Sequence, residues 1–60
     1  MTAQDSATIQ ELVQAAKKRA EDAGAAMHMA DFKAVYENLF EILVITATLN
    51  QIVDQAEARA

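Results

Sequence analysis

Apolar residues recur at alternating intervals of three and four along most of the chain, and this pattern constrains the fold more than any other feature. In the first half the repeat comprises Ile9, Val13, Ala16, Ala20, Ala23, Met27 and Ala30, with Leu12 widening it. In the second half it comprises Phe32, Val35, Leu39, Ile42, Thr46, Leu49, Val53 and Ala56. Such spacing places side chains on one face of an α-helix. The chain has no Pro and one Gly, so we expect an all-α fold.

Capping residues indicate where the helices begin and end. Thr2 and Asp5 form a variant of a capping box, with Ser6 as a competing N-cap. Asp31 is the best internal N-cap, and a tight turn is expected just before it. Gly24 could instead end the first helix early, because glycine is common just past a helix C-terminus.

These signals predict two helices, at about 4–28 and 31–58. Helices of nearly equal length joined by a short turn fold back on each other, so we expect an antiparallel helical hairpin. At 60 residues, the chain has room for one domain, residues 1–60. It has no Cys, which excludes disulfides and thiolate metal sites, so a second copy of the chain is the expected source of additional core.

Charge and hydropathy argue against several classes of partner. The net charge of −4 disfavours general binding to nucleic acid or anionic membranes. The longest apolar stretch, Leu39 to Val53, is interrupted by polar residues and is shorter than the roughly 20 residues of a transmembrane helix. The first ten residues lack the basic and apolar regions of a targeting segment, so we expect a cytoplasmic protein with no membrane association.

The second helix has more apolar surface than one neighbour can cover. With about 100° between successive residues, Ile45 and Ile52 lie on one flank of its repeat. The other flank carries Tyr36, Phe40, Leu43 and Val44, and only a narrow polar ridge remains (Glu37, Glu41, Thr48, Gln51 and Gln55). We therefore expect the hairpin to self-associate, in the simplest case as a homodimeric four-helix bundle. The residues expected to carry self-association are Val35, Leu39, Phe40, Ile42, Leu43, Ile45, Leu49, Ile52 and Val53.

Few residues could perform chemistry. His28 and Asp31 have a spacing compatible with two metal ligands, but His28 is better explained as a turn residue at the end of the first helix. Glu37 and Glu41 share a helix face and are most simply a solvated ridge. The chain has no paired nucleophile and base, so we expect no enzyme, no cofactor and no metal site.

Lys17, Lys18 and Arg19 form the one basic cluster, and Glu21 and Asp22 follow at spacings that would pair with the two lysines. In size and layout the predicted dimer resembles the plasmid-copy-control protein Rop, a dimer of helical hairpins that binds paired RNA loops. The resemblance is architectural, and no motif matches residue by residue.

The sequence thus predicts a small, non-enzymatic, homo-oligomeric regulatory protein that binds another protein. One alternative is a Rop-like dimer that binds nucleic acid through Lys17, Lys18 and Arg19. Another is an acidic inhibitor, for example one encoded by a phage, that covers a basic protein surface. The pattern leaves open the direction in which two hairpins dock and whether more than two associate.

Overall fold

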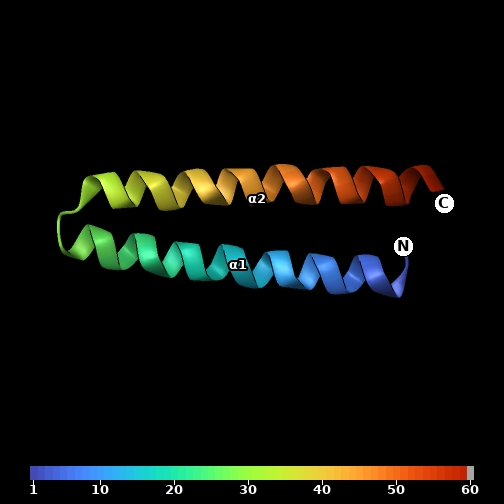
Figure 1. Cartoon of the computed structure of the whole chain (residues 1–60), viewed down its shortest axis with the longest axis horizontal. Helices are drawn as coiled ribbons and strands as arrows, with labels where there is room; N and C mark the ends of the chain where they lie inside the picture. Colours follow the sequence, from blue (N-terminus) through green and yellow to red (C-terminus); the bar gives the residue numbers. More distant parts are fainter. Residues whose placement is uncertain (60) are drawn as a thin grey trace.

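The computed structural model describes residues 1–59 and consists of two long helices lying side by side in opposite directions (Figure 1). Helix α1 spans Ala3–His28 and helix α2 spans Phe32–Arg59. The predicted hairpin is confirmed: the end of the first helix at His28 agrees with the prediction, and the other three helix ends differ by one residue. Gly24 lies inside α1, so the first helix continues past it to His28.

A capping box fixes the start of α1. The hydroxyl of Thr2 accepts a hydrogen bond from the Asp5 backbone N–H, and Asp5 Oδ2 accepts one from the Thr2 backbone N–H, each at 3.1 Å. Arg59, at the far end of α2, also donates to Asp5 Oδ2 at 2.7 Å. The hydrogen bond from the Thr2 backbone is the main reason that the pKa of Asp5 lies below its ordinary value of 3.8, and the charge of Arg59 acts in the same direction.

The turn between the helices is a Schellman motif closed by an alanine. The N–H of Ala30 donates to the Met27 carbonyl at 3.0 Å, and the N–H of Asp31 donates to the Ala26 carbonyl at 2.9 Å. This geometry holds Ala30 at φ 57°, in the left-handed region. Asp31 then caps α2, as predicted, by accepting from the Ala34 N–H at 3.2 Å.

The seam, meaning the line of residues along which the two helices pack, shares every second residue with the predicted repeats. At the alternate positions the seam residue is the one just before the predicted residue, so each helix is turned by part of one residue's rotation. On α1 the less exposed residues include Ile9, Leu12, Ala16, Ala23 and Ala26. On α2 they include Val35, Asn38, Ile42, Ile45, Leu49, Ile52 and Ala56. Part of the predicted repeats is therefore wrong, because seven of their residues are exposed: Val13, Ala20, Met27, Ala30, Phe32, Leu39 and Thr46. Ile45 and Ile52 were predicted on an uncovered flank, and they are half-buried in the seam instead.

The hairpin has a very small core. The buried apolar residues are three alanines, Ala23, Ala26 and Ala56, and the larger seam residues stay partly exposed. A pair of helices is only one layer thick, so each seam side chain has neighbours on one side alone. Neither helix, as described, is long and apolar enough to cross a membrane.

Candidate functional site

The most prominent surface feature is an apolar face that extends over both helices. We call it the open face and define it by Val13, Ala20 and Met27 of α1 with Phe32, Leu39 and Leu43 of α2. Its large side chains are well exposed, from 44% for Val13 to 63% for Phe32 and Leu43.

The antiparallel arrangement places the two halves of the open face on the same side of the hairpin. Val13 and Ala20 lie at the edge of the seam, each one position after a residue that faces or contacts α2, so both are turned from the centre of the seam in the same sense. Leu39 follows the seam residue Asn38 in the same way. The helices run in opposite directions and face each other across the seam. A residue one position after a seam residue therefore points to the same side of the hairpin in α1 as in α2. The exposed apolar residues of both helices therefore lie on one side of the hairpin.

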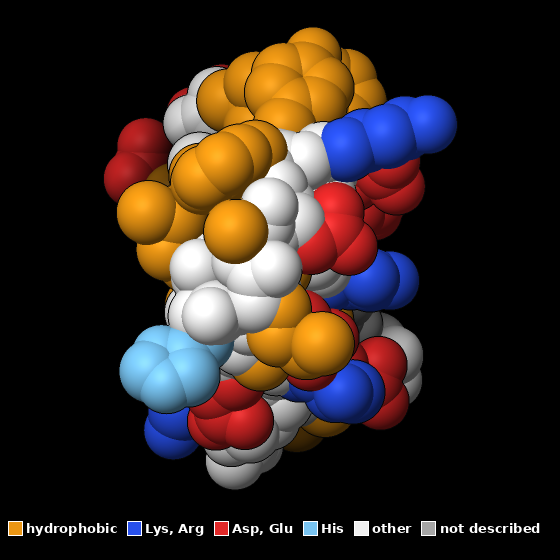
Figure 2. Space-filling model, turned by 90° about the vertical axis from the view of Figure 1, so that its left-hand side faces the viewer, with side chains coloured by type: hydrophobic (Ala, Val, Ile, Leu, Met, Phe, Trp, Pro, Cys, Tyr) orange, Lys and Arg blue, Asp and Glu red, His pale blue; other side chains and the backbone are white. Residues whose placement is uncertain are grey.

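Figure 2 shows the asymmetry of the surface from the turn end, with α2 above α1. Hydrophobic side chains cover the top and the upper left of the molecule, whereas Lys, Arg, Asp and Glu alternate down the right side. The apolar side chains are thus concentrated over α2 and on one side of it, while charged side chains dominate the other side and also occur on the lower left, over α1.

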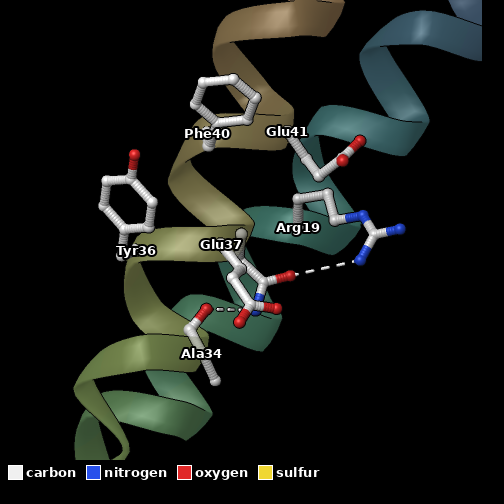
Figure 3. Close-up of a pocket in the computed structure, with 7 residues that line it drawn as sticks. Arg19, Ala34, Tyr36, Glu37, Phe40 and Glu41 are labelled. Atoms are coloured by element: carbon white, nitrogen blue, oxygen red, sulfur yellow. Dashed lines mark hydrogen bonds between the residues drawn. The ribbon is translucent and has the colours of Figure 1, made fainter.

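A groove of about 370 Å³ lies on the charged side, along α2. Its lining residues are Arg19, Ala34, Tyr36, Glu37, Asn38, Phe40 and Glu41. In Figure 3 the rings of Tyr36 and Phe40 lie on one side of the two glutamates, and Arg19 reaches in from α1 on the other. The two rings are stacked, with their centroids 6.3 Å apart.

One hydrogen bond joins the helices at this groove, and a second, within α2, holds the side chain that accepts it. Arg19 Nη1 donates to Asn38 Oδ1 at 3.3 Å, and Asn38 Nδ2 donates to the Ala34 carbonyl at 2.8 Å. Asn38 is a polar residue in an otherwise apolar seam, and these bonds satisfy both ends of its amide. The sequence analysis did not identify Asn38 as a seam residue. Its spacing, three residues after Val35 and four before Ile42, is nevertheless the spacing of a residue on the seam face of α2.

The nine residues predicted to carry self-association divide into two groups. Leu39, Phe40 and Leu43 are exposed and remain available to a partner. Val35, Ile42, Ile45, Leu49, Ile52 and Val53 are half-buried, and most of them already face α1. More of the uncovered apolar surface of α2 therefore lies in the half of the helix nearest the turn than the sequence pattern predicted.

The basic cluster does not form a single surface. Successive helical residues point about 100° apart, so Lys17, Lys18 and Arg19 spread over more than half of the circumference of α1. Lys18 pairs with Asp22 at 3.4 Å, as predicted, and Arg19 bonds to Asn38. No ion pair joins Lys17 to Glu21 within residues 1–59.

The remaining polar candidates lie apart from one another. His28 occupies the last turn of α1, and residues 1–59 contain no group of three or more His, Cys, Asp or Glu that could hold a metal ion. Thr46 returns its hydroxyl to the Ile42 carbonyl at 2.8 Å, as expected for a threonine inside a helix. Comparison with protein-family models, with curated proteins and with solved structures finds no match.

Proposed function

We propose that this protein is a non-enzymatic regulatory module that self-associates and binds another protein. Two hairpins meet through their open faces and form a homodimeric four-helix bundle, which then presents its charged side to the partner. The observation that carries the proposal is the open face, an apolar surface on one side of a hairpin whose buried apolar residues are three alanines.

The hydrophobic effect favours this assembly. At roughly 25 cal/mol per Å² of apolar surface removed from water, covering side chains such as Phe32, Leu39 and Leu43 on two chains contributes several kcal/mol before the cost of association. Burying the open face also gives the half-buried seam residues neighbours on their second side. The same contact therefore stabilises each hairpin as well as the pair.

The accessible surface area supports a contact of ordinary size. A compact folded protein of this mass has an accessible surface of about 3800 Å². The hairpin exposes 4597 Å². The excess is close to the roughly 800 Å² that each partner buries in a standard protein interface.

The rotation of the seam supports the same assembly. In a four-helix bundle each helix contacts two neighbours, so the centre of its apolar surface points between them. The sequence repeats of both helices are centred between the seam and the open face. A repeat that served the hairpin alone would be centred on the seam itself.

Sedimentation equilibrium or light scattering after size exclusion tests the assembly directly. We expect the wild-type chain to have twice the mass of one chain at micromolar concentration. Leu43→Asp places a charge on the open face and should give the mass of one chain. Gln51→Asp, a matched change on the polar ridge of the same helix, should retain the mass of two. A wild-type mass of one chain throughout the micromolar range would overturn the proposal.

Ile45→Asp separates assembly from folding. Ile45 is half-buried in the seam, so a carboxylate there should remove much of the helical circular dichroism signal as well as lowering the mass. Leu43→Asp should lower the mass and leave a larger share of that signal. Equal effects of the changes at positions 43, 45 and 51 would contradict the proposed orientation of α2.

A further inference from the structure

A second unpartnered surface lies on the side of α2 that faces away from α1. We call it the aromatic stripe and define it by Tyr36, Phe40 and Val44, which are four residues apart and 68%, 50% and 45% exposed. Glu37 and Glu41 form a parallel row beside it and line the groove described above. The surface thus combines an apolar row with an acidic row along the same helix.

Neither Glu37 nor Glu41 of the acidic row forms an ion pair with another residue in the range 1–59. Within residues 1–59 the ion pairs are Lys18–Asp22 and Arg59–Asp5, and neither involves Glu37 or Glu41. Arg19 is the cation that reaches into the groove, and its guanidinium bonds to Asn38. In Figure 3 the two glutamates lie between Arg19 on one side and Tyr36 and Phe40 on the other. Arg19 is the one Lys or Arg among the residues that line the groove, so none of these lining residues brings a positive charge to the aromatic side.

The structure leads us to propose that the aromatic stripe and the acidic row bind a basic amphipathic helix of another protein. This inference rests on the proposed function, because it names the chemistry of the partner. The occupant is a helix that lays apolar side chains on Tyr36, Phe40 and Val44 and places Lys or Arg side chains against Glu37 and Glu41.

The spacing of the two rows favours a helical partner. Rows of residues four apart form ridges on α2, and the groove between two such ridges accepts a ridge from a second helix. A guanidinium or ammonium group between the rows meets two carboxylates and the faces of two aromatic rings, both of which attract a cation. The net charge of −4 attracts a basic partner at longer range as well.

The proposed dimer leaves the acidic row accessible. Glu37 and Glu41 each precede a seam residue by one position, so they are turned from the seam in the sense opposite to Leu39 and Leu43. The acidic row and the open face therefore lie on opposite sides of the hairpin. Tyr36 follows the seam residue Val35 as Leu43 follows Ile42, so the aromatic stripe begins on the side of the open face. The acidic row is therefore the part of the surface that can be changed separately from self-association.

A synthetic helix tests the inference. The probe is a fluorescent amphipathic peptide of about 18 residues with Leu on one face and Arg four residues apart beside it. Its binding to the full chain is followed by fluorescence anisotropy, and a second peptide with Glu in place of Arg serves as the comparison. We expect the Arg peptide to bind and the Glu peptide to bind at least tenfold more weakly.

A pair of double variants locates the binding site. Glu37→Gln with Glu41→Gln should weaken binding of the Arg peptide about tenfold, and Phe40→Ala should weaken it as well. Glu11→Gln with Glu21→Gln makes the same change in net charge on α1 and should alter the affinity less than twofold. Equal losses in the two double variants, or equal binding of the two peptides, would overturn the inference.

Measuring the mass of the same samples distinguishes this inference from the proposed assembly. If the wild-type chain has the mass of one chain and still binds the Arg peptide through Glu37 and Glu41, the assembly fails and the inference stands. If the Glu37→Gln, Glu41→Gln variant loses its dimeric mass, the surface belongs to self-association and the inference is overturned.

Discussion

At the scale of single residues, the one glycine and the one left-handed residue occupy different positions. Gly24 lies inside α1, where it lowers helix propensity, and an added Cβ would meet nothing within 4 Å. Ala30 closes the turn at φ 57°, where its own Cβ is unfavourable. The N-cap residue Asp31 predicted where the turn ends. The sequence did not indicate that Ala30 adopts the left-handed conformation, because that position is not occupied by glycine.

Replacing Ala30 by Gly should stabilise the hairpin. Glycine adopts a positive φ without the steric cost that alanine bears, so we expect the free energy of unfolding to rise by about 1 kcal/mol. Urea unfolding followed by circular dichroism at fixed protein concentration measures the change. Ala25→Gly is the matched control, because it makes the same replacement inside α1, where we expect a loss of about 1 kcal/mol. A change of the same sign at both positions would contradict the account of the turn.

At the scale of the helices, the sequence predicted the type, length and direction of both elements but not their rotation. Capping residues such as Thr2 and Asp31 act locally, so their positions can be read from the sequence. Rotation depends on which part of a broad apolar surface meets the neighbouring helix. In α2 that surface extends from Ile45 past Leu39 to Phe40, and periodicity alone does not distinguish the side covered by α1 from the side that stays open.

The candidate site was predictable to a similar degree. An excess of apolar surface on the second helix follows from the sequence, and Leu43, Phe40 and Val44 are exposed as expected. The groove was not predictable, because it depends on Arg19 of α1 meeting Asn38 of α2. This hydrogen bond depends on which residues of α1 lie opposite which residues of α2, and a periodic apolar pattern does not determine that register.

Asp5 and Arg59 link the start of α1 to the end of α2, and this link should depend on pH. The folded state lowers the pKa of Asp5 below 3.8, so its carboxylate stabilises the fold above that value. The contribution disappears as the pH falls through the folded pKa. We expect Asp5→Asn to lower the melting temperature at pH 7, and we expect its difference from the wild type to shrink as the pH is lowered below 3.8, as followed by circular dichroism.

A second variant separates the capping box from the ion pair. Arg59→Gln removes the charge at the end of α2 and keeps the bonds between Thr2 and Asp5. Because the Thr2 backbone has the largest effect on the pKa of Asp5, Arg59→Gln should lower the melting temperature less than Asp5→Asn. A destabilisation by Asp5→Asn that is the same at pH 7 and pH 2 would contradict this interpretation.

At the scale of the whole molecule, the dimensions of the hairpin favour the proposed assembly. The molecule measures 46 × 16 × 9 Å, so it is long and one helix layer thick. Chains of this size rarely obtain enough stability from a single core, and two helices alone cover each other on one side only. The proposed assembly through the open face would supply the second layer. In that assembly the open face would contribute to the stability of each hairpin, and the acidic row on the opposite side would stay accessible to the proposed partner.

This coupling predicts that thermal unfolding depends on protein concentration. When two folded chains bind each other and unfolded chains do not, a tenfold rise in concentration stabilises the folded state by about 1.4 kcal/mol of dimer. The melting temperature of the wild-type chain should therefore rise by several degrees over that range, since small domains have small unfolding entropies. Leu43→Asp should melt at a lower temperature that is independent of concentration, whereas Gln51→Asp should keep the dependence. A wild-type melting temperature that stays constant over a tenfold range would mean that a single hairpin is stable with its open face in water.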